Sequence, residues 1–367
     1  MRLITLAPLA ASAATLAIFA FSAARAEPAA RISGPFVHEN LSVYFVHGTS
    51  TPGPVPLTLQ EALAKGGVTV VETKSVNELK IENTGTEDVF IQAGDIVKGG
   101  QQDRVLTVSL VLPPKSGQVP IASFCVEQGR WSARGREDVS KFSSSADAMP
   151  SREAKLAMAA PAKPAPTPGQ ATTGSLDQRI GARNLLGGSD ISERQQKVWR
   201  EVASTQDKLS AGLNERVAAA ASATSLQLAL ENDKLKGARV AYTVALGDKA
   251  KGQDDVIGYV FVVNGRINSA DIYPSNGLFQ KMWPKLLAAS VTEAIGEKNK
   301  QVAAGPMPAM PAIDEVQKFL AAAEAGTPHQ QDIAKLMRRE TRDAKEGLYT
   351  QASRADGAWV HRNYLAK

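Results

Sequence analysis

Short apolar segments, some with alternating apolar and polar residues, recur through residues 31–142, and this pattern predicts mainly β-strands. Segments 41–46 and 68–72 contain the β-branched and aromatic residues that are typical of strands. Apolar residues at every second position from Leu106 to Leu112 would lie on one face of a single strand. We therefore expect an antiparallel, sandwich-like arrangement in this part of the chain.

The period of the pattern changes within residues 189–300, where apolar positions recur every three or four residues and predict helices. The continuous apolar segment 256–263 predicts a strand, and the dipeptide Asn264-Gly265 predicts the tight turn of a hairpin. The apolar stripe over 278–295 predicts a long helix after that hairpin. This half of the protein should therefore contain a helix, a hairpin and a second helix.

Residues 143–188 break both patterns. The serine run 143–145 and the Ala/Pro-rich run 159–168 bury too little apolar surface to offset the entropy of ordering. We expect a flexible, low-complexity insert. Because such a long loop is unusual inside a compact domain, the alternative is a linker between two domains.

These elements predict an α+β fold, with an antiparallel β-rich N-terminal half packed against a helix, hairpin and helix in the C-terminal half. After residue 300 we expect two helices and a terminal pair of strands around Asp356-Gly357. The predicted divisions are 1–26, a signal peptide; 27–142, the β-rich half of the main domain; 143–188, the insert; 189–300, the helical and hairpin half; and 301–367, the C-terminal helices and terminal hairpin.

The N-terminal segment has the three parts of a secretory signal. Arg2 precedes an uncharged stretch, and Ala24-Arg25-Ala26 supplies small residues at the cleavage positions. We expect cleavage after Ala26, a periplasmic or secreted protein, and no membrane span in the mature chain. A membrane anchor is the alternative, although Pro8 and the many alanines make the stretch weakly hydrophobic.

Composition limits the partners. Removing Arg2 and Arg25 leaves 40 basic and 37 acidic residues, too balanced a charge to favour nucleic acid. With Cys125 as the only cysteine, no intramolecular disulfide can form, and the four histidines show no metal-ligand spacing. We predict no structural metal and no cofactor.

One polar block, residues 92–104, combines a glycine turn with charged and amide side chains. Its glycines allow backbone N–H groups to approach an anion closely. The alternative is a charged hairpin turn with surface ion pairs, each of which stabilises by about 0–1 kcal/mol. The candidate ligand-binding residues in this block are Asp95, Lys98, Gln101, Asp103 and Arg104.

The second block, residues 123–131, adds the candidates Glu127, Arg130 and Trp131. Arginine offers a planar fork for carboxylate or phosphate, and tryptophan offers a stacking face. A cation–π contact that holds a strand end is the alternative. Cys125 is expected to be a buried, unreactive thiol, because the nearby carboxylate disfavours the thiolate.

A third block, residues 258–285, contributes the candidate Asp271, which lies near the end of the predicted hairpin and before a helix. Carboxylates of binding sites often occupy such positions. Phe279 and Trp283 are expected to pack in the core, and Lys285 has no assigned role.

Together these blocks resemble a bacterial family of unknown function, the ARG-and-rhodanese-phosphatase-superfamily-associated protein domain. The resemblance covers about residues 33–300 and implies that both halves belong to one domain, with 143–188 as an insertion. It implies no particular reaction. The matching segments are 92–95, 98–104, 125–131, 262–266, Asp271 and 278–287.

Two functions remain open at this point, besides a purely structural envelope protein. The first is an exported soluble domain that binds an unknown small molecule or an envelope protein through these candidate residues. The second is a metal-independent hydrolase or lyase. In it Asp95, Asp103 or Glu127 would act as acid or base, while Arg104 or Arg130 would hold an anion.

Overall fold

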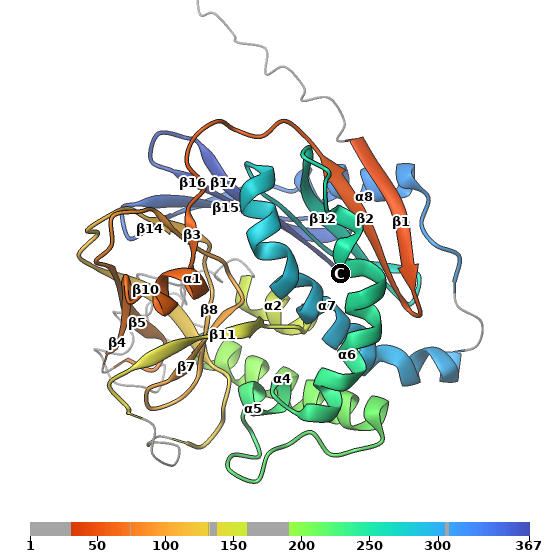
Figure 1. Ribbon diagram of the computed structural model, residues 1–367, viewed down its shortest axis with the longest axis horizontal. Helices are drawn as coiled ribbons and strands as arrows, with labels where there is room; N and C mark the ends of the chain where they lie inside the picture. Colours follow the sequence, from red (N-terminus) through yellow and green to blue (C-terminus); the bar gives the residue numbers. More distant parts are fainter. Residues whose placement is uncertain (1–30, 74, 131, 133–137, 160–190, 305–307) are drawn as a thin grey trace, which may run out of the picture.

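The computed structural model describes residues 31–73, 75–130, 132, 138–159, 191–304 and 308–367. The signal-peptide prediction and Trp131 therefore lie outside the described residues. Antiparallel sheets dominate the N-terminal half and helices lie mainly in the C-terminal half, which confirms the α+β class (Figure 1).

The largest sheet has eight strands, all antiparallel, and it joins distant parts of the chain. Strands from the N-terminus pair with the central hairpin, which pairs with strands from the C-terminus (Figure 1). The predicted hairpin is confirmed, and both turn residues, Asn264 and Gly265, have positive φ angles of 51° and 71°. In spatial order the strands are β1 (Arg31–His38), β2 (Leu41–His47), β12 (Val256–Val263), β13 (Arg266–Ile272), β17 (Trp359–Ala366), β16 (Gly347–Arg354), β15 (Met337–Asp343) and β14 (Pro328–Ile333).

Two smaller sheets complete the β-structure. A six-stranded sheet has the order β11 (Phe142–Ala148), β7 (Asp95–Gly99), β8 (Arg104–Leu106), β10 (Gln118–Cys125), β5 (Glu78–Asn83) and β4 (Val68–Glu72). A three-stranded sheet consists of β3 (Leu57–Thr58), β6 (Val89–Ile91) and β9 (Leu110–Leu112).

The prediction of one strand over 106–112 is wrong. Residues 107–109 belong to no strand, and β8 and β9 on either side of them pair in different sheets. The alternating apolar pattern did not reveal this break, because the apolar residues on both sides of it are buried. The break matters for the site, because it frees the side chain of Ser109 for contacts outside a sheet.

The helices are α1 (Leu59–Ala64), α2 (Arg152–Ala159), α4 (Ile191–Leu213), α5 (Leu226–Leu230), α6 (Asp233–Leu246), the short 3-10 helix η1 (Gly247–Ala250), α7 (Asn276–Ala304) and α8 (Ile313–Glu324). Helix α7 packs on one face of the eight-stranded sheet, where Phe45 and Phe261 meet Trp283. On the other face, α8 contributes Phe319 to a separate apolar cluster that includes Tyr44. The large sheet is thus covered on both faces.

Two segments differ from the sequence prediction. Part of the predicted flexible insert is regular, since β11 extends to Ala148 and α2 covers Arg152–Ala159. Residues 160–188 of the insert lie outside the described part. Beyond residue 308 the structure has one helix and four strands instead of two helices and two strands. Strand β14 escaped prediction because it is a polar edge strand with one buried residue, Ile333, and so lacks apolar alternation.

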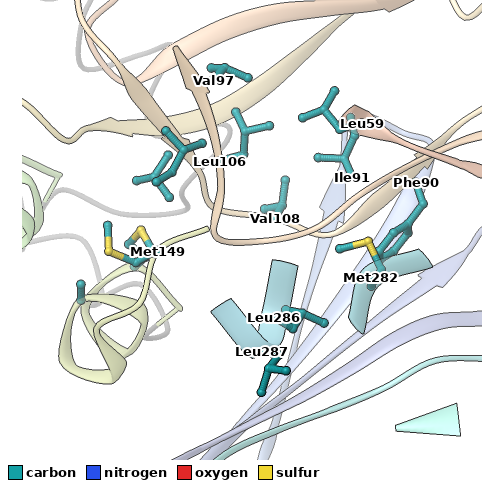
Figure 2. Packing of buried hydrophobic residues seen from close by; sticks show 14 of the residues in the cluster. Leu59, Phe90, Ile91, Val97, Leu106, Val108, Met149, Met282, Leu286 and Leu287 are labelled. Atoms are coloured by element: carbon teal, nitrogen blue, oxygen red, sulfur yellow. The ribbon is translucent and has the colours of Figure 1, made fainter. Parts of the chain in front are cut away.

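The central core connects the small sheet with α7. Figure 2 shows Phe90 and Ile91 of β6 near Met282 of α7, with Leu286 and Leu287 further along the same helix. This apolar region continues toward the cavity described below.

Candidate functional site

The structure separates the candidate residues into two groups. Strands β8 and β10 pair with Arg104 opposite Cys125, which brings the first two polar blocks together in the six-stranded sheet. We call this the sheet group; its described members are Lys98, Gln101, Asp103, Arg104, Glu127 and Arg130. Asp95 and Asp271 instead lie toward α7 and the eight-stranded sheet.

Ion pairs dominate the sheet group. Arg130 Nε donates to Glu127 Oε2 at 2.7 Å, and its Nη2 lies 3.9 Å from Asp103 Oδ1. Asp103 also accepts a hydrogen bond from the backbone N–H of Gly99 at 2.9 Å. Lys98 is hydrogen-bonded to Glu231 at 2.7 Å. These contacts hold strand β7, the turn after it and the segment after β10 in place.

Arg104 is fully buried beside the cysteine. Its Nη1 lies 2.7 Å from Cys125 Sγ and donates to Gln102 at 3.2 Å, while its Nη2 lies 3.5 Å from Glu72. Burial raises the pKa of Cys125 to about 11, although the guanidinium of Arg104 acts in the opposite direction. The expectation of a buried cysteine is confirmed, and the raised pKa disfavours a nucleophilic role.

Asp95 forms a buried ion pair. Its Oδ1 accepts from Lys285 Nζ at 2.9 Å, and its Oδ2 accepts from the backbone N–H of Gln92 at 2.9 Å. Lys285, which had no role in the sequence analysis, therefore joins α7 to the start of β7.

A cavity lies between α7, α2 and the eight-stranded sheet, with an empty volume of about 750 Å³ that includes open solvent at its mouth. Val108, Met149 and Leu286, all labelled in Figure 2, form part of its apolar wall. Among the candidate residues that the structure describes, Asp271 lines this cavity and the sheet group does not.

Three polar side chains on the cavity wall form a hydrogen-bonded relay, which we call the Ser109–His361–Asp271 relay. Ser109 Oγ lies 2.9 Å from His361 Nδ1, and His361 Nε2 lies 3.0 Å from Asp271 Oδ1. None of the three residues is more than 8% exposed. The residues come from the break after β8, from β17 and from β13.

Asp271 is held by several donors. Besides His361, it accepts from Asn363 Nδ2 at 2.8 Å, from Gln92 Nε2 at 3.4 Å and from the hydroxyl of Tyr259. Burial alone would raise the pKa of Asp271, but the hydrogen bonds and positive charge around it outweigh burial and hold that pKa below its usual value. The group therefore remains a carboxylate at neutral pH.

Two cationic residues, Lys155 of α2 and Arg339 of β15, also line the cavity. Lys155 lies close enough to Asp271 for its charge to lower the pKa of that carboxyl. Arg339 is 8% exposed and donates to Gln331 at 2.7 Å. Its Nε has no hydrogen-bond partner within the part of the chain that the structure describes.

Sequence reasoning missed most of this site. Ser109, His361, Lys155 and Arg339 are far apart in the chain and belong to no local motif. The available signal was a single histidine in the terminal strand, which alone suggests a core position as readily as a site.

Within the described residues, no group of three or more His, Cys, Asp or Glu side chains is arranged to hold a metal ion. None of the helices within these residues is long and apolar enough to cross a membrane.

The structure is that of an α+β protein with a buried polar relay on the wall of a cavity. The chain belongs to the family of the ARG and Rhodanese-Phosphatase-superfamily-associated Protein domain, whose model matches residues 29–365. The resemblance seen in the sequence is thus confirmed, and the family match extends through the C-terminal strands. No curated protein and no solved structure matches the chain.

Proposed function

We propose that this protein is an exported binding protein whose cavity takes a small organic anion. The observation that carries this proposal is the buried guanidinium of Arg339, whose Nε lacks a partner among the described residues and which lies on the cavity wall. A buried donor without a partner is unfavourable by about 1–3 kcal/mol, and more when it is charged. An anion at this position would supply the missing acceptor.

The electrostatics around Arg339 support the same proposal. Burial and, after it, the positive charge of the neighbouring Arg194 together lower the pKa of Arg339 to about 10. Like charges in a buried region favour an anionic ligand, because its charge offsets both the desolvation and the repulsion. Lys155, on the same wall, adds to the positive potential.

The other residues on the cavity wall indicate what the non-anionic part of the ligand should be. Val108, Met149 and Leu286 offer an apolar surface, while Gln351 and Asn363 offer hydrogen bonds. The ligand class that fits is a carboxylate or phosphate attached to a compact, partly apolar body.

The two functions left open by the sequence are affected differently. A hydrolase or lyase that uses Asp95, Asp103 or Glu127 as acid or base has little support, because none of these carboxylates lines the cavity. Asp95 and Glu127 are hydrogen-bonded to Lys285 and Arg130 instead. Ligand binding by the sheet group stays a prediction. Export stays a proposal that rests on residues 1–26, and N-terminal sequencing of protein from a periplasmic fraction should give Glu27 as the first residue.

Thermal shift measurements test the binding proposal. The purified protein would be screened with aliphatic and aromatic carboxylates and with sugar phosphates. A ligand at 100 times its Kd should stabilise the native state by about 2.7 kcal/mol. The informative variant is Arg339→Gln, and the matched control is Arg338→Gln, which alters a neighbouring arginine whose side chain is 59% exposed.

We expect the shift to disappear in Arg339→Gln and to persist in Arg338→Gln. An anion that shifts all three proteins equally would place binding elsewhere. The absence of any shift across the whole screen would contradict the proposed function.

A further inference from the structure

We propose that Ser109 is a nucleophile and that the cavity hydrolyses a carboxylic ester whose acid portion carries the anion held by Arg339. This activity rests on the cavity of the proposed function, but it adds a reaction to binding. The geometry that points to it is the Ser109–His361–Asp271 relay, in which hydroxyl, imidazole and carboxylate are in hydrogen-bond contact in that order.

The carboxylate of Asp271 fixes the direction of the hydrogen bond from His361, and with a neutral imidazole it also fixes the direction of the bond between His361 and Ser109. Its carboxylate is an acceptor only, and His361, Asn363, Gln92 and Tyr259 all direct donors at it. His361 Nε2 must therefore carry a proton. In the neutral imidazole the other nitrogen, Nδ1, is then an acceptor, and the hydroxyl of Ser109 donates to it. This is the proton arrangement that a serine nucleophile requires.

The hydroxyl of Ser109 is also oriented by the backbone. Its Oγ accepts a hydrogen bond from the N–H of Ala93 at 3.0 Å. A hydroxyl oxygen has two lone pairs, so one remains for attack after this contact. The N–H of Ala93 and the ring of His361 together fix the side-chain rotamer, which reduces the loss of freedom on reaching the reactive geometry.

If these hydrogen bonds only stabilised the fold, the three residues would not need to lie on the wall of a cavity. Ser109, His361 and Asp271 line the same hollow as Lys155 and Arg339. The charge of Lys155 acts on Asp271, which locates Lys155 near the relay, whereas Arg339 is close to Arg194. We therefore assign Lys155 to the developing oxyanion and Arg339 to the anionic group of the substrate.

The reaction has two steps. In the first, Ser109 Oγ bonds to the ester carbonyl carbon while its proton passes to His361 Nδ1, and the alcohol leaves with that proton as the carbon–oxygen bond breaks. In the second, water attacks the acyl-serine and gives a proton to His361. The bond to Oγ breaks, and Ser109 regains the proton. The net reaction consumes an ester and water and yields an acid and an alcohol.

Covalent labelling with a fluorophosphonate probe tests the nucleophile, with mass spectrometry to locate the modified residue. We expect labelling at Ser109 in the native protein and in Ser145→Ala, a control in which another buried serine is removed. Labelling should disappear in Ser109→Ala. In His361→Gln it should slow by about 10²- to 10⁴-fold, the usual contribution of a general base. Hydrolysis of p-nitrophenyl hydrogen succinate, an ester with a free carboxylate, should show the same ranking.

A second variant keeps the test informative if Ser109→Ala does not fold. Ser109→Cys places a thiol next to His361, while the native Cys125 is buried and has a pKa of about 11. The rate of alkylation by iodoacetamide at neutral pH should rise in Ser109→Cys, and adding His361→Gln should shift its pH profile to higher pH.

Two outcomes separate this inference from binding. If the native protein shows a carboxylate-dependent thermal shift but no label at Ser109, and the Ser109→Cys pH profile does not depend on His361, the relay is structural and only binding stands. If Ser109 is labelled but no anion shifts the protein, the nucleophile stands and the proposed anion site fails.

Discussion

Lys285 Nζ donates a hydrogen bond to Asp95 Oδ1 at 2.9 Å, and the side chains of the two residues are 7% and 2% exposed. The pair connects the middle of α7 to the first residue of β7, so it joins the long helix to the six-stranded sheet. Both residues lie in segments that the family resemblance singled out. Their contact indicates that these segments are linked through the packing of the domain.

We expect Asp95→Ala to destabilise the protein by about 3–5 kcal/mol, because removal of one partner leaves a buried charge without its counter-ion. Urea denaturation would measure this loss. The matched control is Lys281→Ala on the same helix, whose ion pair with Glu61 at 3.2 Å is partly exposed and should contribute about 0–1 kcal/mol. Equal effects of the two substitutions would contradict a special role for the buried pair.

Local turn chemistry in the sequence predicted the central hairpin correctly. The Asn264-Gly265 turn and its two strands were predicted because the turn chemistry acts over a few residues. The pairing of β2 with β12 joins residues more than 200 positions apart, such as Leu41 with Val263, and no local pattern encodes it. The eight-stranded sheet therefore could not be derived from periodicity.

The candidate site was predicted only in part for the same reason. Asp271 was identified because a carboxylate at the end of a strand is a local feature. Ser109 and His361 reach it from two other segments, the break after β8 and strand β17, and neither residue alone carries a sequence signal. The many polar residues close together in the sequence predicted a site at the sheet group instead. In the structure, residues of this group form ion pairs with one another, such as Glu127 with Arg130.

Arg130→Met tests whether the sheet group is structural. Glu127 is fully buried and its Oε2 accepts from Arg130, so loss of the guanidinium should destabilise the protein by about 3–5 kcal/mol. We expect anion binding in the cavity to be unchanged, as measured by calorimetric titration below the melting temperature. A normal stability with lost anion binding would instead support the site that the sequence predicted at residues 127–131.

Cys125 should resist alkylation in the native protein. With a pKa of about 11, its thiolate fraction at pH 8 is smaller than that of an ordinary cysteine by a factor on the order of 100. Burial adds a steric barrier. Iodoacetamide should therefore modify the thiol slowly in buffer and rapidly in denaturant, as followed by intact mass. Rapid modification of the folded protein would show that the thiol is accessible and ionised.

The contacts of Arg104 with Cys125 indicate that Arg104 has a structural role. Its guanidinium contacts both Cys125 and Glu72, and the raised pKa of the cysteine persists because burial exceeds this attraction. In Arg104→Met we expect the alkylation of the folded protein to be no faster, since the cation that favours the thiolate has been removed. Faster alkylation would indicate that the substitution opens the sheet around Cys125.

Acid should weaken the contribution of Asp271 to stability. Its pKa is lower in the folded protein than the value of about 3.9 expected for an unfolded aspartate. A group with a lowered folded pKa binds fewer protons in the native state, so its stabilising effect is complete above about pH 3.9 and declines as the pH falls through its folded pKa.

Asp271→Asn lacks this titration and loses the charged acceptor for His361, which should reduce stability at neutral pH by about 1.5–3 kcal/mol. Urea denaturation between about pH 6 and about pH 3 should show the difference between native protein and variant narrowing toward acid. A difference that stays constant, or that widens as the pH falls, would mean that Asp271 is not held as a carboxylate by its donors, and the proton arrangement inferred for Ser109 and His361 would then fail with it.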